Sequence, residues 1–206
     1  INHVEVVANV DDGIEFFGGT VNASNLLVWG QGDDAIDIDQ AYAGTIDRAM
    51  VILTDASDHG FEVDGPEGSA AGSFTLKNAT VLGATKACSA LGVNGEMADF
   101  RKAATGSLSN ILFKDFSGGK DVELDASADA ASYTAGTLTF ANIDIIHPVS
   151  DGAVCSNVET LNQIFDDKSD ESTFEADAST FAEVVTEQQA GNGVDSSIFS
   201  WTFYAR

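Results

Sequence analysis

The fold is decided by one stretch, Gly19-Thr20-Val21-Asn22-Ala23-Ser24-Asn25-Leu26-Leu27-Val28-Trp29, followed by Gly32-Asp33-Asp34-Ala35-Ile36-Asp37-Ile38. In it a Gly-Thr pair restarts the chain, an apolar run follows, and a short segment then alternates apolar and acidic residues. The same order recurs, with restarts at Gly19-Thr20, Gly44-Thr45, Gly72-Ser73, Gly106-Ser107 and Gly136-Thr137. The intervals are 25, 28, 34 and 30 residues, and periods of this length are typical of solenoid proteins.

Each repeat contains two strand-like segments. The first segments are Leu26-Leu27-Val28-Trp29, Met50-Val51-Ile52-Leu53, Thr80-Val81-Leu82, Ile111-Leu112-Phe113 and Ile143-Asp144-Ile145-Ile146. The second are Ile14-Glu15-Phe16, Ile36-Asp37-Ile38, Phe61-Glu62-Val63, Ala98-Asp99-Phe100 and Val122-Glu123-Leu124. Alternation with a period of two, bounded by Gly, Asn and Asp, predicts short strands. The sequence therefore predicts an all-β fold, a right-handed parallel β-helix, with a β-sandwich or a set of unrelated hairpins as alternatives.

Two regions are expected, coils over residues 1–160 and a C-terminal cap over residues 161–206. The strand-like run Val4-Glu5-Val6-Val7 precedes the first restart, so we expect an incomplete first coil with more coils, another domain or a partner upstream. In the cap, residues 166–172 are expected to form a solvated loop and residues 179–189 one short helix. The aromatic end of the chain is expected to form a strand, and residues 174–206 to cover the open end of the solenoid.

The charge of the chain excludes several classes of function. The 206 residues include 33 Asp and Glu against 9 Lys and Arg, so the formal net charge is −24. So few basic residues argue against nucleic acid and anionic lipid surfaces as partners. No stretch approaches the roughly 20 uninterrupted apolar residues of a membrane span. The 44% of hydrophobic residues suffices for a sizeable core, which excludes a disordered acidic tail.

The acidic residues of the short strands fall into columns if the coils stack in register. One outward column is Glu15, Asp37, Glu62, Asp99 and Glu123, and the next is Phe17, Asp39, Asp64, Arg101 and Asp125. Carboxylates about 4.8 Å apart repel each other, and solvent, a raised pKa or a bound cation relieves the repulsion. Because Ca²⁺ prefers such ligands, a Ca²⁺ site is predicted at Glu15, Asp37, Asp39, Glu62 and Asp64. The alternative is a solvated acidic face in which Arg101 neutralises its neighbours.

The turns before these strands carry a further pattern, Asn9-Val10-Asp11-Asp12-Gly13, Gly32-Asp33-Asp34 and Asp58-His59-Gly60. It resembles the Asn-Thr-Asp, Gly-Asp-Asp and Gly-His-Gly motifs on successive coils of polygalacturonase-type glycoside hydrolases. The resemblance implies an inverting hydrolysis with Asp34 as the acid, Asp12 or Asp33 as the base and His59 in a supporting role. The Arg-Ile-Lys motif of that family has no match, because Arg101-Lys102 lacks the isoleucine.

A second resemblance covers most of residues 4–125. The run Asp11-Asp12-Gly13-Ile14-Glu15-Phe16-Phe17-Gly18-Gly19-Thr20-Val21-Asn22, followed by Asp33-Asp34-Ala35-Ile36-Asp37, is similar to exported bacterial β-helix proteins of the pectate-lyase-like superfamily. Chains of that group have no assigned function and often end in a segment like Trp201-Thr202. The resemblance implies a parallel β-helix in the cell envelope or outside the cell.

The cysteines allow two interpretations. Cys88 and Cys155 are the two cysteines of the chain, and neither stands in a spacing typical of a metal site. We predict one disulfide between them, formed in an oxidising compartment, with two buried thiols as the alternative.

These patterns favour a secreted or cell-surface structural or binding module, for adhesion or assembly, over an enzyme. The expected partners are a polysaccharide or cell-surface ligand and further copies of the chain, joined through the solenoid ends as a homo-oligomer or filament. The sequence requires no cofactor, and Ca²⁺ is the one that its acidic columns would accept. The alternative function is a polysaccharide-degrading hydrolase that acts through its paired Asp residues.

Overall fold

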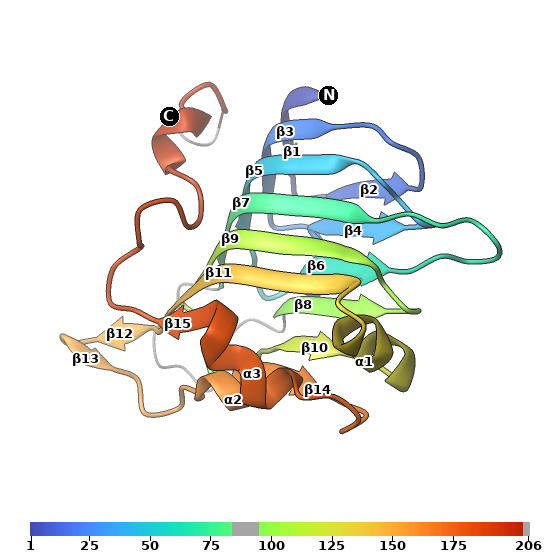
Figure 1. Cartoon of the computed structure of the whole chain (residues 1–206). Helices are drawn as coiled ribbons and strands as arrows, with labels where there is room; N and C mark the ends of the chain where they lie inside the picture. The colour runs from blue at the N-terminus through green and yellow to red at the C-terminus, as the bar shows by residue number, and fades with distance from the viewer. Residues whose placement is uncertain (84–94, 204–206) are drawn as a thin grey trace.

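The computed structural model describes residues 1–83 and 95–203, which form stacked coils of parallel strands (Figure 1). In spatial order, the seven-stranded sheet contains β1 (Asn2–Val7), β3 (Ala23–Trp29), β5 (Thr45–Ile52), β7 (Phe74–Leu82), β9 (Gly106–Lys114), β11 (Leu138–Ile146) and β15 (Ala182–Val184). The six-stranded sheet contains β2 (Ile14–Phe17), β4 (Ile36–Asp39), β6 (His59–Asp64), β8 (Glu96–Arg101), β10 (Val122–Leu124) and β14 (Phe165–Asp167). Consecutive coils supply neighbouring strands in both sheets, so the predicted all-β, right-handed parallel β-helix is confirmed.

The apolar residues of equivalent strands stack into columns inside the solenoid. Ile14 pairs with Ile36, Ile36 with Phe61 and Phe61 with Ala98 in the six-stranded sheet. Ile14, at the end of this column, is half-buried, and the others are fully buried. These four residues lie on adjacent strands of one sheet, so the register predicted from the repeats is confirmed.

Each long strand from β3 to β11 bends at one residue with a positive φ. The bends lie at Asn25 (φ 54), Arg48 (φ 63), Asn78 (φ 56), Asn110 (φ 57) and Asn142 (φ 54). The Nδ2 of Asn110 donates to the Oδ1 of Asn78 at 3.0 Å, and the Nδ2 of Asn142 donates to the Oδ1 of Asn110 at 3.0 Å. Asparagine tolerates a left-handed backbone better than most residues with a side chain, so this column fixes the bend and connects the coils.

Replacement of one asparagine of this column is expected to destabilise the fold. In Asn110→Ala two amide hydrogen bonds are lost and alanine is held at positive φ, so the free energy of unfolding should fall by about 2 kcal/mol. Asn110→Gly loses the same bonds but fits the backbone, and about half of that loss is expected. Urea unfolding measures both, with Ser109→Ala as the control one residue earlier. A wild-type midpoint for Asn110→Ala would contradict a stabilising role of the amide column.

Two short helices cover one end of the solenoid. They are α2 (Leu161–Ile164) and α3 (Phe174–Phe181), and they lie next to β14 at the bottom of Figure 1. The ring centroid of Phe174 lies 4.9 Å from that of Phe140 and 5.7 Å from that of Phe165, so aromatic side chains close the core at this end. Helix α1 (Ser127–Thr134) follows β10, and a hairpin of β12 (Val149–Ser150) and β13 (Ala153–Val154) follows β11.

The prediction of one short helix over residues 179–189 is wrong, because the described part of the cap contains two α-helices and neither has these bounds. The cap region contains α2 as well as α3, and α3 ends at Phe181. Phe174 and Ala178 bury one face of α3, and the chain then extends because Ala182–Val184 adds β15 to the edge of β11. Together with β14, this strand continues the two sheets beyond residue 160.

The loop and the C-terminal strand that the sequence predicts for the cap also differ from the observed structure. The loop expected over residues 166–172 begins inside β14, where the side chain of Asp167 is buried. The aromatic end forms a 3₁₀ helix, η1 (Ser196–Phe199), followed by turns up to residue 203, in place of a strand. This segment lies along the outer face of the seven-stranded sheet, not over the open end, because the outward side chains of Leu27 and Met50 offer it an apolar surface.

Candidate functional site: an acidic face on the six-stranded sheet

The predicted acidic column exists on the outer face of the six-stranded sheet. Glu15 pairs with Asp37, Asp37 with Glu62, Glu62 with Asp99, and Asp99 with Glu123. β14 adds one member that the sequence analysis missed, since Glu123 pairs with Asp166. The neighbouring column is present where Phe17 pairs with Asp39 and Asp64 pairs with Arg101.

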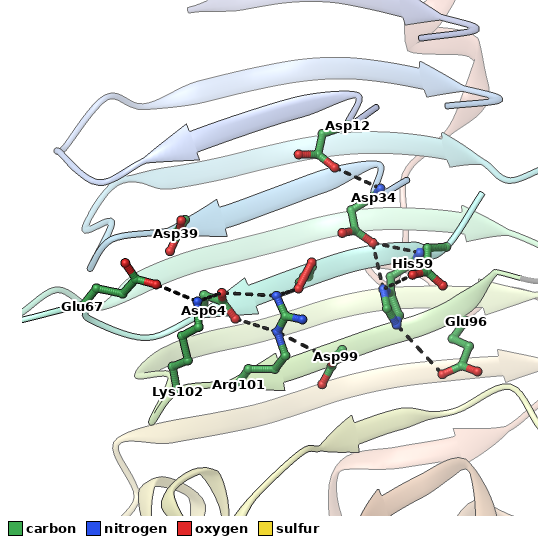
Figure 2. Close-up of polar contacts among 12 residues, drawn as sticks. Asp12, Asp34, Asp39, His59, Asp64, Glu67, Glu96, Asp99, Arg101 and Lys102 are labelled. Atoms are coloured by element: carbon green, nitrogen blue, oxygen red, sulfur yellow. Dashed lines mark hydrogen bonds and ion pairs between the residues drawn. The ribbon is translucent and has the colours of Figure 1, made fainter. Parts of the chain in front are cut away.

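Basic side chains neutralise the middle of this face (Figure 2). The Nε of Arg101 donates to Asp64 at 2.7 Å, and its guanidinium also pairs with Glu62 and lies 3.8 Å from Asp99. The Nζ of Lys102 lies 2.7 Å from carboxylate oxygens of both Asp64 and Glu67. The sequence-based alternative, in which Arg101 neutralises its neighbours, therefore describes this part of the face.

A second set of ion pairs neutralises the lower end of the face. The Nζ of Lys168 lies 3.0 Å from Asp121, 3.0 Å from Glu123 and 2.6 Å from Asp166. Lys168 follows β14, so the cap supplies the counter-charge for the last coils. Sequence reasoning missed this contact because Lys168 lies far along the chain from Asp121 and Glu123.

The upper end of the face carries a carboxylate cluster. One carboxylate oxygen each of Asp12, Glu15 and Asp37 lies within 4.8 Å of the others. In the described ranges, no Lys or Arg forms an ion pair with these three residues. Burial and the negative charges of Asp12, Asp34 and Glu15 raise the pKa of Asp37 to about 7. Burial also raises the pKa of Asp12 and Glu15, so the cluster is under electrostatic strain that a cation or protons relieve.

A further row of polar residues lies at the start of the short strands. The backbone N–H of Asp34 donates to Asp12 at 3.1 Å, and the backbone N–H of His59 donates to Asp34 at 3.0 Å. The Nδ1 of His59 lies 2.8 Å from the same Asp34 oxygen, and its Nε2 lies 4.0 Å from Glu96 (Figure 2). Burial lowers the pKa of His59, but the hydrogen bond and charge of Asp34 outweigh this and raise the pKa to about 9. The His59 ring is therefore positively charged at neutral pH and paired with Asp34.

The residues of the hydrolase-like pattern lie together, but most have structural contacts. Asp34 is 3% exposed, and its Oδ1 accepts both hydrogen bonds from His59. Oxygens of the acid candidate Asp34 and the base candidate Asp33 lie within 4.8 Å, closer than the roughly 6.5–9.5 Å between acid and base that admits water in inverting hydrolases. Gly60 is also required by packing, because a Cβ there would lie 2.7 Å from Val81.

The five predicted Ca²⁺ ligands do not lie together in one site. Glu15 and Asp37 meet in the upper cluster, together with Asp12, which the sequence analysis had placed only in the hydrolase pattern. Glu62 and Asp64 pair with Arg101, and Asp39 belongs to none of the close carboxylate groups among the described residues. Geometry therefore favours Asp12, Glu15 and Asp37 as the ligand set. The turn residue Asp12 could have been found from its place two residues before β2.

The predicted disulfide falls partly outside the described residues. Cys155 is buried after β13. Cys88 lies outside the described ranges, so the pairing of Cys88 with Cys155 stays a prediction.

Stacked coils, two parallel sheets and a continuous acidic face define a class of protein, the parallel β-helix with a charged lateral surface. The chain belongs to the pectate-lyase-like beta helix domain family, which it matches over residues 1–203, and this confirms the superfamily resemblance. No curated protein and no solved structure matches the chain. Among the described residues, none of the helices has the length and apolar character to span a membrane.

Proposed function

We propose that the chain is a rigid binding module, secreted or displayed at a cell surface, whose acidic face binds Ca²⁺. The cluster of Asp12, Glu15 and Asp37 carries this proposal, because no Lys or Arg within residues 1–83 and 95–203 forms an ion pair with it, unlike the middle and lower end of the face. Carboxylate oxygens within 4.8 Å of one another match the ligand type and flexible geometry that Ca²⁺ accepts. The bound cation would stabilise the first coils and offer a partly coordinated ion to an anionic polysaccharide or surface ligand.

Ca²⁺ is expected to raise the melting temperature of the protein. A free Ca²⁺ concentration of about 100 times the dissociation constant raises the free energy of unfolding by about 2.7 kcal/mol, which corresponds to a rise in melting temperature of about 5–10 °C. Differential scanning calorimetry with Ca²⁺ and with chelator measures this shift. Asp37→Asn should abolish it, while Glu123→Gln should retain it, because Glu123 lies in the same column but is paired with Lys168. An unchanged melting temperature on addition of Ca²⁺ to the wild type would contradict the proposal.

Association between copies is part of the same proposal. α2 and α3 cover one end of the solenoid, while β1 and β2 are the edge strands at the other end. Because unpaired edge strands favour association, we propose contact between copies through the solenoid ends, as a homo-oligomer or filament. Sedimentation velocity at high salt, where the net charge of −24 is screened, tests this point. A purely monomeric protein under these conditions would contradict it.

A polysaccharide hydrolase is the second candidate, favoured by the position of Asp12, Asp33 and His59 on adjacent coils. Release of reducing ends from polygalacturonate by the wild type, and its loss in Asp33→Asn, would support this function. Asp33→Asn is the cleaner variant, because Asp34 holds His59 and its replacement disturbs the turn. The binding module is expected to release no reducing ends.

A further inference from the structure

A column of outward residues runs along the seven-stranded sheet, on the face opposite the core. The members of this column, which we call the outer strip, are Glu5, Leu27, Met50, Thr80, Leu112, Asp144 and Glu183. The five members between Glu5 and Glu183 are buried although they point away from the core, with Leu27 4% and Leu112 3% exposed. They are buried because residues 189–203 cross all seven strands, from the C-terminal coil back to the first coil (Figure 1). We call residues 189–203 the latch.

The lower part of the latch is held by polar contacts. The backbone N–H of Gln189 donates to Asp144 at 2.7 Å, and the Nδ2 of Asn192 donates to the other oxygen of Asp144 at 2.7 Å. The Nε2 of Gln189 donates to Glu183 at 2.9 Å. Two acidic members of the outer strip are therefore matched by neutral amide donors, and both oxygens of the buried Asp144 accept a hydrogen bond.

The middle of the latch lies directly against the strands. The backbone N–H of Gly193 donates to the carbonyl of Asn110 at 2.9 Å, and that of Val194 donates to the Oγ1 of Thr80 at 2.9 Å. Gly193 has a φ of +68, and a Cβ at this position would lie 2.7 Å from Thr80 and 2.8 Å from Leu112. This close approach requires glycine.

Apolar side chains anchor the upper part of the latch. Phe199 is 1% exposed and forms a cluster with Leu27, Met50 and Val194. Beyond it, the backbone N–H of Phe203 donates to Glu5 at 2.9 Å, on the first strand of the sheet. The latch thus contacts the outer strip from Glu183 to Glu5 in reverse chain order.

The contacts of the latch are those of a bound peptide. It contributes no strand to either sheet, and its apolar cluster is separate from the core inside the solenoid. We propose that the latch is an internal ligand of the outer strip, which detaches while the solenoid stays folded and leaves a docking surface for the same segment of a second copy. The segment that fits has two apolar anchors five residues apart, Val194 and Phe199, preceded by the side-chain amides of Gln189 and Asn192.

Hydrogen exchange on the full-length protein tests whether the latch opens independently. The amides of Gly193 and Val194 are expected to exchange at least about 100-fold faster than those of core strands such as β7. Phe199→Ala should accelerate the latch amides by a further tenfold or more and leave the β7 amides within about threefold of wild type. Phe203→Ala is the matched control, because this ring is 76% exposed and its backbone N–H is retained.

Binding of the same segment from outside tests the docking surface. A fluorescent synthetic peptide of residues 189–203 is expected to bind the full-length Phe199→Ala protein and not the wild type or Phe203→Ala. Asn192→Ala, which removes one hydrogen bond to Asp144 but keeps the apolar anchors, should show weaker binding of the same kind and serves if Phe199→Ala unfolds. Exchange of latch and core amides at one common rate, or no peptide binding to either weakened variant, would overturn the proposal.

Discussion

Asp167→Ala is expected to lower the free energy of unfolding by about 4 kcal/mol and the melting temperature by about 8–16 °C. The carboxylate of Asp167 is 1% exposed and points inward at the end of the six-stranded sheet. It accepts hydrogen bonds from the backbone N–H and hydroxyl groups of Ser169 and Ser172 and from the backbone N–H of Glu171. Without it, the N–H groups of this turn lose their acceptor beside the aromatic cap, and the turn between β14 and α3 loses the side chain that holds it.

The matched control is Asp166→Asn, one residue earlier on the same strand. The carboxylate of Asp166 faces outward and pairs with Lys168, so its loss should cost no more than about 1 kcal/mol. Calorimetry of the two variants and the wild type separates the inward from the outward carboxylate. Equal melting temperatures for the two variants would contradict the structural role of Asp167.

The stabilisation that Asp167 provides is expected to decrease as the pH falls. Burial raises the pKa of Asp167, but the hydrogen bonds from Ser169 and Ser172 outweigh this and hold the pKa below its ordinary value. The stabilisation is therefore fully present above the unfolded pKa of about 3.9 and disappears as the pH falls through the folded value. Asp167→Asn should reduce the acid sensitivity of the cap along with its stability.

The solenoid could be predicted from the sequence because every coil repeats the same alternation of inward apolar and outward acidic residues. Ile36-Asp37-Ile38 places two side chains inside and one outside, and the register of its neighbours follows. The inward position of Asp167 could not be predicted in this way, because the equivalent position in the preceding coil is occupied by the apolar Leu124. An inward Asp breaks the alternation, and nothing in the strand itself indicates that a later serine-rich turn satisfies it.

Two further features had sequence signals that the alternation did not reveal. The asparagines at the bends share one position in the coils, and Asn78, Asn110 and Asn142 are evident once the long strands are aligned. The latch has a weaker signal: Leu26-Leu27-Val28 is apolar on both faces, which is typical of a strand covered on both sides. The segment that covers Leu27 lies at the far end of the chain, so its position required the structure.

The candidate site was predictable as a column but not as a charge distribution. Neighbouring carboxylates follow from the register, and the contact of Arg101 with Asp64 follows from their places on adjacent strands. The contact of Lys168 with Glu123 depends on how the cap folds back on the sheet, which local patterns do not encode. The absence of a basic partner near Asp37 among the described residues emerges only from this distribution.

Acidification from pH 8.5 to pH 5.5 is expected to stabilise the Ca²⁺-free protein by at least about 2 kcal/mol, or about 4–8 °C in melting temperature. Burial and the charge of Glu123 raise the pKa of Asp99 to about 8, and burial and the charge of Asp121 raise that of Glu96 to about 7. Asp37, also at about 7, belongs to the same group. The folded state therefore binds more protons than the unfolded state in this range, and stability falls as the pH rises.

The ionisation of His59 also makes the protein more stable at lower pH, although His59 is positively charged when protonated. Its pKa is raised to about 9, because the contribution of Asp34 exceeds the lowering by burial, so its stabilisation is fully present below about 6.5 and disappears as the pH rises towards 9. Calorimetry at constant ionic strength, with chelator present, measures the combined slope. Asp99→Asn should flatten it, because the substituted side chain no longer ionises, whereas Asp166→Asn should leave it unchanged. A wild-type melting temperature that rises from pH 5.5 to pH 8.5 would contradict this prediction, because it would show that ionisation of these carboxyl groups does not destabilise the fold. In that case electrostatic repulsion in the upper cluster would not favour the binding of a cation.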